Sequence, residues 1–251
     1  TGKFTYTKVE DSISGFDGVA TSLVKDLAIT VTGDSSKTKF EALKTKVGAS
    51  GTITGTIVDD PSNLTTTNAG ANATIVAKLK SGQTDLTGVT LDSKVTKIDL
   101  AGFKTAKLSI KNLTGRTVKN DASGDFKITD TPSKLTEVAA LAIIKAQAKQ
   151  VVVNESAATL NYDQLKKLTD NISRSKITYT KFKDSLTNIK KLNLKDHYEG
   201  VAVEVDTADI KVADFSSLFT AVGRSGSVKA SIKDDVSALD SSVDLTGATK
   251  V

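Results

Sequence analysis

Apolar and polar residues alternate with a period of two in five short segments of the chain, at 4–7, 52–57, 126–128, 177–180 and 228–232. Such alternation predicts strands that bury one face. The same eight-residue pattern lies at or just after each segment. Its first and last residues are apolar, its third is Asp, its fourth is small and polar, its fifth is apolar or Pro, its sixth is Ser or Thr, and its second and seventh are variable. Its five copies begin at Val9, Ile57, Ile128, Phe182 and Ile232. The pattern predicts a recurring corner between a strand and a helix.

The acid of each corner stands where a helix N-cap is expected. These corner acids are Asp11, Asp59, Asp130, Asp184 and Asp234, and they lie 48, 71, 54 and 50 residues apart. An Asp or hydroxyl oxygen at this place accepts hydrogen bonds from the first amides of a helix. Pro61 and Pro132 follow a capping candidate, where a missing N–H costs nothing. The clearest helix is expected from 131 to 150, where apolar residues form one stripe.

A second half-unit also recurs, with an apolar strand followed by an aromatic residue and a Leu three positions later. The pairs are Phe40 and Leu43, Tyr162 and Leu165, and Phe215 and Leu218. Each pair lies on one face of a predicted short helix, and Gly48 and Gly223 are expected to end two of these helices as left-handed C-caps. The full unit is therefore strand, helix, strand and short helix in about 50 residues.

These units predict an α/β repeat protein, an elongated, β-rich, solenoid-like array that forms one domain over 1–251. The approximate units are 3–51, 52–124, 125–174, 175–226 and a partial unit 227–251. The second unit carries an insertion at about 65–115, in which 95–100 and 106–110 are expected to form an extra strand pair. Because no unit could bury both faces of its strands alone, neighbouring units must stack.

Composition excludes several kinds of chemistry. The chain has 251 residues and no Cys, Met or Trp, and it contains one His, so thiolate sites and His-rich metal cages are excluded. The longest apolar run, 138–144, is too short to span a membrane, so we expect a soluble chain without a membrane span. Because the chain begins at Thr1, it reads as a processed product or a piece of a longer protein.

The charge balance is basic but argues against nucleic acid as a partner. Lys and Arg number 34 against 29 Asp and Glu, and only three of the cations are Arg, the residue that nucleic-acid readers favour. A solvated Lys-rich surface is one interpretation, and attraction to acidic glycan or to an anionic cell envelope is the other. Thr and Ser are unusually frequent along the chain, which favours extended structure with a polar face.

The third and fourth units resemble the tandem repeats of large secreted bacterial cell-surface proteins, the repeat arrays of giant adhesins and S-layer-like proteins. The resemblance lies in residues 128–135, 159–165 and 177–189, where a strand ends in an Asp-Ser/Thr corner and a later Leu-containing helix precedes the next strand. It covers about half of the chain well. Those proteins are usually acidic and many carry calcium-binding nonapeptides, whereas this chain is basic and has none.

Candidate sites have alternative interpretations. The corner acids either cap helices or form a row of calcium sites, in which Asp60 and Asp235 would add second carboxylates. No catalytic or cofactor-binding residue emerges: His197, the single histidine, stands in the charged segment 195–200 and is expected in a solvated turn. Five sequons are candidates for glycosylation, at Asn63, Asn72, Asn112, Asn154 and Asn171.

The sequence therefore predicts a non-enzymatic structural protein that is secreted and located on the cell surface, outside the cell. It would be a repeat segment of an S-layer, sheath, filament or adhesin, and its main partner would be itself, through self-assembly. It needs no cofactor on this interpretation, with calcium as the alternative. The second hypothesis is a module that binds carbohydrate or envelope polymer, and the third is an enzyme that cleaves polysaccharide with paired carboxylates.

Overall fold

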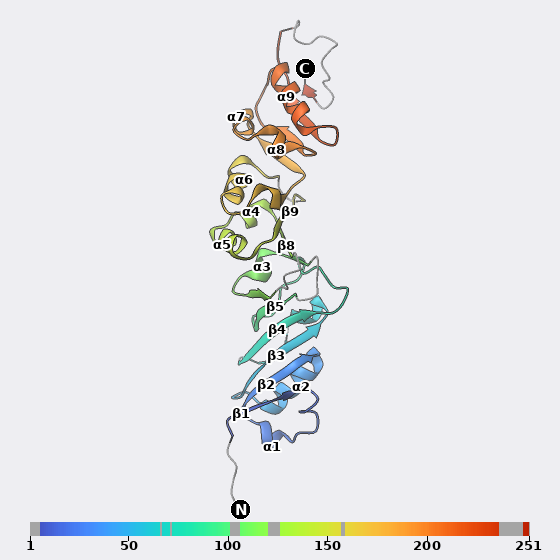
Figure 1. Ribbon diagram of the computed structural model, residues 1–251, viewed down its shortest axis with the longest axis vertical. Helices are drawn as coiled ribbons and strands as arrows, with labels where there is room; N and C mark the ends of the chain where they lie inside the picture. Colours follow the sequence, from blue (N-terminus) through green and yellow to red (C-terminus); the bar gives the residue numbers. More distant parts are fainter. Residues whose placement is uncertain are drawn as a thin grey trace, which may run out of the picture. The chain divides into compact units, whose positions relative to one another are not determined.

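The computed structural model describes residues 6–65, 67–70, 72–100, 106–119, 126–156, 159–235 and 248–250. The fold is α/β with parallel sheets, and helices and strands contribute about equally, so the expected excess of strand is wrong. The chain forms two compact units. Unit 1 comprises Thr1–Ile128 with Gln147–Lys149, and unit 2 comprises Thr129–Ala146 with Gln150–Val251. The elements of both are labelled in Figure 1.

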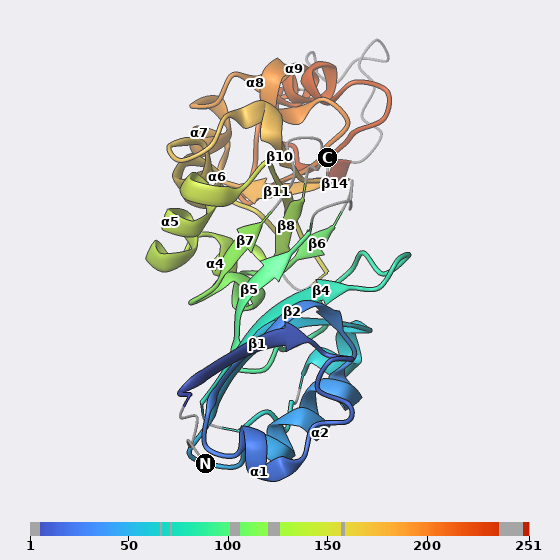
Figure 2. The ribbon, with the colours of Figure 1, turned by 60° about the horizontal axis from the view of Figure 1, so that its bottom comes forward.

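Unit 1 is built on a six-stranded parallel sheet in the order β1-β2-β3-β4-β5-β7 (Figure 2). Its elements are β1 (Lys8–Ser12), α1 (Thr21–Val24), β2 (Ala28–Ser35), α2 (Lys37–Val47), β3 (Thr52–Asp59), a 3₁₀ helix (Pro61–Leu64), β4 (Ala73–Leu79), β5 (Val95–Asp99), β6 (Lys107–Leu108), α3 (Ile110–Leu113) and β7 (Thr117–Lys119). Except for β6, strands that follow each other in the chain are neighbours in the sheet. Each strand therefore needs a crossover to return the chain to the next one.

The register gives the number of residues from one strand of unit 1 to the next. Lys8 pairs with Ala28, and Ala28 in turn pairs with Thr52. Ile53 pairs with Ala73 and Ile75 with Val95, so the later steps are of similar size. Each step is a little under half of the repeat inferred from the sequence. We call one strand with the crossover that follows it a module. The expected unit of strand, helix, strand and short helix therefore spans two modules.

Unit 2 contains parallel strands and most of the helix of the chain. After β8 (Lys127–Asp130) come α4 (Pro132–Leu135), α5 (Val138–Gln147), β9 (Gln150–Val153), α6 (Tyr162–Thr169), a second 3₁₀ helix (Arg174–Lys176), β10 (Ile177–Thr178), β11 (Lys181–Asp184), α7 (Leu186–Lys190), α8 (Leu194–Tyr198), β12 (Ala202–Val205), α9 (Val212–Val222), β13 (Ser227–Ser231) and β14 (Ala248–Lys250). β9 pairs in parallel with β10, and β11, β12, β13 and β14 form a four-stranded parallel sheet.

Alternation along each strand separates a buried face from an exposed face. In β3, Ile53 and Ile57 are fully buried, whereas Thr52 and Thr54 are exposed. The inner face of unit 1 packs on Phe40 of α2, which has no exposed surface. Burying such a side chain stabilises the fold by about 1.5–3 kcal/mol. Apolar side chains of successive modules thus form one column along the inner face of the sheet.

Most predicted elements are present, with shifted bounds. The strands predicted at 52–57, 126–128 and 228–232 correspond to β3, β8 and β13, and Pro61 and Pro132 start helices as expected. Residues 4 and 5 of the first predicted strand lie outside the described residues, and β1 begins later, so Asp11 lies within a strand. The helix predicted at 131–150 is two helices, α4 and α5, and β9 already begins at Gln150.

Two further expectations need correction. The segments at 95–100 and 106–110 do contain strands, but they do not pair with each other: β5 lies between β4 and β7, and β6 pairs with β8. Gly48 and Gly223 do end α2 and α9 with positive φ, but their ψ angles are −177° and −171°. That region is accessible essentially to glycine alone, so these residues are not left-handed C-caps. None of the helices in the described part of the chain has the length and apolarity needed to cross a membrane.

Candidate functional site: the corner carboxylates

Three corner acids accept a hydrogen bond from the first amide of a helix that precedes them in the chain. Asp59 Oδ2 accepts from the Lys37 N–H (3.3 Å) at the start of α2. Asp184 Oδ2 accepts from Tyr162 N–H (2.8 Å) in α6, and Asp234 Oδ2 from Val212 N–H (3.1 Å) in α9. In all three cases the donor lies 22 residues before the acid. A carboxylate at a helix N-terminus also interacts favourably with the helix dipole.

The other carboxylate oxygen of each acid fixes the corner itself. Oδ1 of Asp59, Asp184 and Asp234 accepts from the N–H of the next residue, at 2.9, 2.7 and 3.0 Å. In two corners an asparagine four residues later adds its amide: Asn63 donates to Asp59 and Asn188 to Asp184. One side chain therefore ties a strand end, the following turn and an earlier helix together.

The sequence predicts an Asp or hydroxyl oxygen as the cap of the helix that follows each corner. Hydroxyl residues form this cap in two corners, since Thr131 accepts from Lys134 N–H and Ser185 from Asn188 N–H. Asp60, before the first 3₁₀ helix, makes no such side-chain bond, and the acids Asp59, Asp184 and Asp234 cap the earlier helix instead. Asp130 accepts from Thr131 N–H at 2.9 Å. The bonds of Asp59, Asp184 and Asp234 to amides 22 residues earlier leave no local sequence signal, because they form only when a strand returns beside the preceding module.

Asp59 is the most strongly perturbed of these acids. Burial raises its pKa, but hydrogen bonds from the Asn63 amide, the Asp60 N–H, the Lys80 ammonium and the Lys37 N–H outweigh burial and lower the pKa to about 2. Its side chain is 9% exposed and lies 3.1 Å from Lys80 Nζ. The ionised carboxylate is therefore part of the folded structure at neutral pH.

The remaining corner residues are more open. Asp11 is exposed and accepts from the N–H of its neighbour Ser12. Asp60 pairs with Lys80, and Asp235 is exposed. Among the described residues, no group of three or more His, Cys, Asp or Glu side chains is arranged to hold a metal ion. The observed contacts of the corner acids are those of capping groups, and the calcium interpretation gains no geometric support from them.

The five sequons differ in accessibility. Asn63, Asn72 and Asn154 are exposed and Asn171 is half-buried. Asn112 is fully buried, with its amide nitrogen 2.7 Å from the Val89 carbonyl and its Oδ1 accepting from Ser109 N–H. The folded chain therefore has no room for a glycan at Asn112, and glycosylation of the other four stays a prediction.

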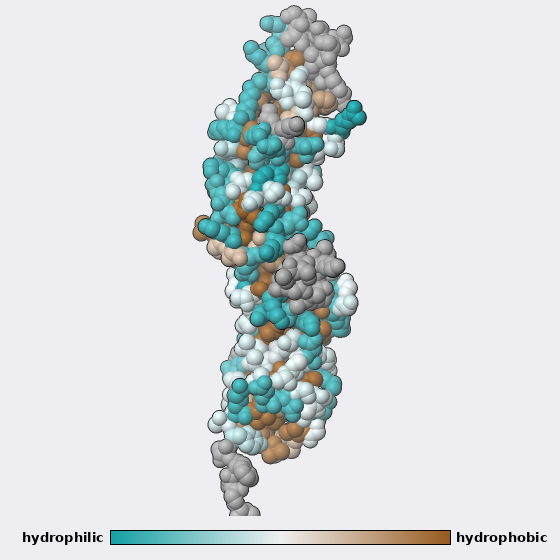
Figure 3. Space-filling model, viewed as in Figure 1, coloured by the Kyte–Doolittle hydropathy of each residue, from teal (hydrophilic) through white to brown (hydrophobic). Residues whose placement is uncertain are grey.

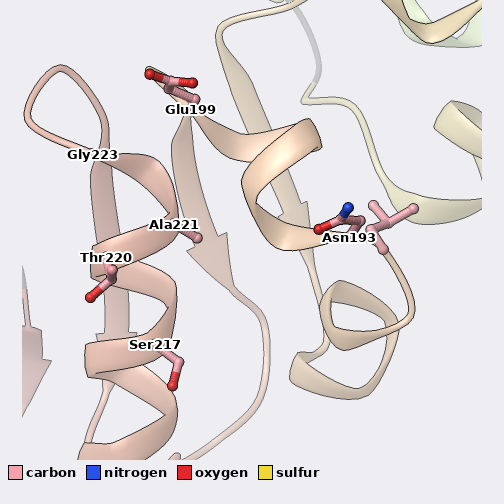
Figure 4. Close-up of a pocket in the computed structure, with 7 residues that line it drawn as sticks. Asn193, Glu199, Ser217, Thr220, Ala221 and Gly223 are labelled. Atoms are coloured by element: carbon pink, nitrogen blue, oxygen red, sulfur yellow. The ribbon is translucent and has the colours of Figure 1, made fainter.

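An open pocket of about 650 Å³ lies within unit 2, between α9 and the chain around α8 (Figure 4). It is lined by Leu192, Asn193, Glu199, Ser217, Thr220, Ala221 and Gly223. The Ser217 and Thr220 hydroxyls donate to carbonyls of their own helix, and Asn193 donates to Asp196. No lining hydroxyl is hydrogen-bonded to a base, so the described lining gives no sign of a catalytic site.

His197 is not in a solvated turn, which corrects the sequence-based expectation. It is half-buried in α8, and its Nδ1 accepts from Arg174 Nε at 3.2 Å. The Arg174 guanidinium also lies 4.6 Å above the ring of Tyr179. Burial lowers the pKa of His197, and the nearby Arg174 charge lowers it further. The cluster has a packing role that the sequence did not reveal, because its members come from separate segments.

Comparison of the chain with protein-family models, with curated proteins and with solved structures finds no match.

Proposed function

We propose that this chain is a non-enzymatic structural segment of the cell exterior, a self-associating repeat region of an S-layer, sheath, filament or adhesin. The observation that carries the proposal is the order of parallel strands: neighbours in the sheet of unit 1 follow each other in the chain, at register steps of nearly constant length. Modules of this kind bury their apolar faces mainly against the next module. On this proposal they form a solenoid-like array that can be extended by association at its ends.

The use of polar groups supports a structural role. Three of the corner acids hold helix amides, His197 accepts from Arg174, and the pocket hydroxyls bond to their own helix. A catalytic centre instead keeps an acid, base or nucleophile available to substrate. Among the described residues, three of the corner carboxylates are already bonded to helix amides, so they give the alternative of a polysaccharide-cleaving enzyme no support.

Several cations also point inward, onto backbone carbonyls of loops. Lys46 Nζ donates to the carbonyls of Phe16, Asp17 and Val19 at 3.1–3.2 Å. The guanidinium of Arg116 donates to six carbonyls, of Leu91, Asp92, Val95, Lys111, Asn112 and Thr114. Calcium orders oxygen-rich loops in many proteins. Here Lys and Arg occupy such positions, which gives part of the basic charge a structural reason.

One observation favours the second hypothesis, a module that binds carbohydrate. Thr30, Thr54 and Thr74 lie in register across β2, β3 and β4 on the outer face of unit 1. Adjacent strands are about 4.8 Å apart, so the three form a regular row of hydroxyl and methyl groups. Lys78, on the same strand as Thr74, is paired with Asp34, so this face suits a neutral glycan better than an acidic one.

The proposed function is tested by negative-stain microscopy of the purified chain over a range of concentrations, with calcium and with a chelator. We expect sheets or fibres under both conditions, because loop cations are supplied by the protein. Dispersed monomers at every concentration would contradict the proposal. A glycan array, with Thr54→Val as the variant and Thr45→Val on the opposite side of the sheet as the matched control, tests the second hypothesis.

A further inference from the structure

β1 is the edge strand of the unit 1 sheet, and its outer side is unpaired in the described part of the chain (Figure 2). The Ala28 N–H donates to the Thr7 carbonyl, so Thr7 and Val9 direct their backbone groups toward β2. Because these groups alternate along a strand, the N–H and C=O of Lys8 and Glu10 face away from the sheet. This edge is therefore ready to accept another strand.

An apolar hollow of about 330 Å³ lies beside the same edge. Its lining includes Tyr6, Val9, Phe16, Leu23 and Val24. Leu23 is 53% exposed and Tyr6 is 42% exposed, and the third large apolar side chain that is exposed among the described residues is Val138 in unit 2. Figure 3 shows apolar residues gathered at this end of unit 1. Two of the three thus lie next to one unpaired strand.

Unit 2 contains an equivalent module in which the same positions are covered. The registers Lys8 with Ala28 and Lys181 with Ala202 make β11 the counterpart of β1. Phe182 then corresponds to Val9 and is fully buried. Lys183, the counterpart of Glu10, donates its N–H to the Leu160 carbonyl of the preceding module at 2.9 Å. The backbone direction deduced for β1 is therefore the one that binds a preceding module in unit 2.

The helix and the corner acid of that module are covered in the same way. α8 corresponds to α1, which places His197 at the position of Leu23, and His197 is covered by Arg174 and Tyr179. Asp184 corresponds to Asp11 and holds the first amide of α6. At β1, the backbone of Glu10, the carboxylate of Asp11 and the side chain of Leu23 all lack this cover within the described chain.

We propose that a second copy of this chain covers the β1 end, in a head-to-tail contact made by the end that carries β14. β14 is the last strand of the β11–β14 sheet and runs parallel to β13. Ser227 N–H donates to the Val201 carbonyl and Ile210 N–H donates to the Ser231 carbonyl, so Ala230 of β13 directs its backbone toward β14, and its register partner Ala248 directs its backbone away from β13. The contact joins two different surfaces, so each pair of copies keeps one free β1 end and one free β14 end and can add further copies.

This inference rests on the proposed function and names the surfaces that would carry it. Two variants each block one end. Leu23→Lys places a charge in the hollow at a position that is already exposed, so the monomer should fold normally. Ala248→Pro removes an outward N–H from the last strand. Lys25→Glu, next to α1, and Lys211→Glu, beside α9, are matched surface controls, and circular dichroism checks that each variant is folded.

Sedimentation velocity over a concentration series gives the decisive readout. The wild-type chain should form a ladder of oligomers, and each blocked variant alone should lose association by roughly tenfold or more. An equimolar mixture of the two blocked variants should form a dimer and nothing larger, since each retains one working end.

Other results would overturn the inference. If Ala248→Pro alone dimerises and Leu23→Lys does not, two β1 ends pair with each other and the head-to-tail contact is wrong. If the wild-type chain is monomeric at all concentrations, both this inference and the proposed function fail. If the wild-type chain assembles and Leu23→Lys assembles equally well, the proposed function stands and the β1 contact is wrong.

Discussion

The α2–β3 corner of unit 1 and the α9–β13 corner of unit 2 are two versions of the same structure, and they align without a gap. Over 36–60 and 211–235 ten positions are identical, namely Phe40, Leu43, Thr45, Val47, Gly48, Ser50, Gly51, Ile57, Asp59 and Asp60 with Phe215, Leu218, Thr220, Val222, Gly223, Ser225, Gly226, Ile232, Asp234 and Asp235. Both helices have 11 residues and end at a glycine. The shared residues are those that fix backbone direction and core packing.

The positions that differ show what the corner tolerates. Ser36 caps α2 with its side chain, whereas Lys211 at the same position of α9 makes no such bond. Lys44 is buried and donates to the carbonyls of Gly48 and Gly51, whereas its counterpart Phe219 stacks on Phe215. The Asp at the strand end is kept in both corners. A local cap and a loop cation are therefore replaceable, and the long-range cap is the feature that defines the corner.

Removing the corner acid should have the largest effect on stability, and the loss should be greater in the α2–β3 corner than in the α9–β13 corner. Asp59→Ala should lower the free energy of unfolding by about 2–3 kcal/mol, because the pKa shift from 3.8 to about 2 corresponds to that amount. Asp234→Ala should cost about 1 kcal/mol, since that acid holds two backbone amides. Urea unfolding followed by circular dichroism measures both. The control Asp60→Ala, at an acid 41% exposed, should change little.

The lowered pKa of Asp59 also predicts how the stability of the chain depends on pH. A depressed carboxyl pKa contributes stability that is fully present above about pH 4 and is lost as the pH falls through about 2. Asp59→Asn should therefore reduce the loss of stability over this range, relative to the wild-type chain. Equal acid sensitivity of the two proteins would show that Asp59 is not the group responsible.

A methyl group at Gly51 or at Gly226 should destabilise the corner in which that glycine lies. A Cβ at Gly51 would lie 2.7 Å from the Leu27 carbonyl oxygen, and one at Gly226 would lie 2.8 Å from that of Val201. Gly51→Ala and Gly226→Ala should each destabilise the chain by about 1–3 kcal/mol. Gly18→Ala is the control, since a Cβ there meets nothing within 4 Å. Thermal unfolding measures the effect, and a cost at only one of the two sites would contradict the equivalence of the corners.

Much of this architecture could be predicted from the sequence, because its signals are local. Alternation in 52–57 predicted β3, and the aromatic–Leu spacing predicted α2 and α9. The Tyr162 assignment failed, because by its bond to Asp184 Tyr162 matches Lys37, and the buried counterpart of Phe40 is Leu165. The expected unit of about 50 residues already contained two strands, and two register steps of unit 1 span 44 residues, from Lys8 through Ala28 to Thr52.

The contacts of the candidate site were less predictable. The bond between Asp59 and Lys37 and the cluster of Arg174 with His197 depend on segments that are 22 and 23 residues apart. No spacing rule of a helix or strand connects such residues. A histidine between charged residues reads as solvated until a preceding module is placed beside it.

The covered position of His197 gives a smaller, pH-dependent difference between the modules. Burial and the charge of Arg174 lower its folded pKa, so the unfolded chain binds more protons below about pH 6.5. Stability should be full above this pH and should fall as the pH drops toward the folded pKa. His197→Asn keeps an acceptor for Arg174 and should flatten urea midpoints between pH 5 and 7. The chain has one histidine, so a slope that persists in the variant would refute this assignment.

The smallest expected effect is a gain in stability. Asp26 has φ of 63°, and its N–H donates to the Val47 carbonyl at 2.8 Å. In unit 2 the same bond, from Gly200 N–H to the Val222 carbonyl, is made by a glycine with φ of 74°. Asp26→Gly should stabilise the chain by about 0.5–1 kcal/mol, because glycine adopts this conformation without strain.

The charge of Asp26 must be separated from its backbone conformation, because burial lowers the pKa of Lys44 and Asp26 partly offsets this by raising it. Asp26→Asn removes the charge and tolerates the left-handed region, and it should leave stability nearly unchanged in urea titrations. If Asn stabilises the chain as much as Gly does, the effect is electrostatic, and the difference between the two corners is one of charge and not of backbone conformation.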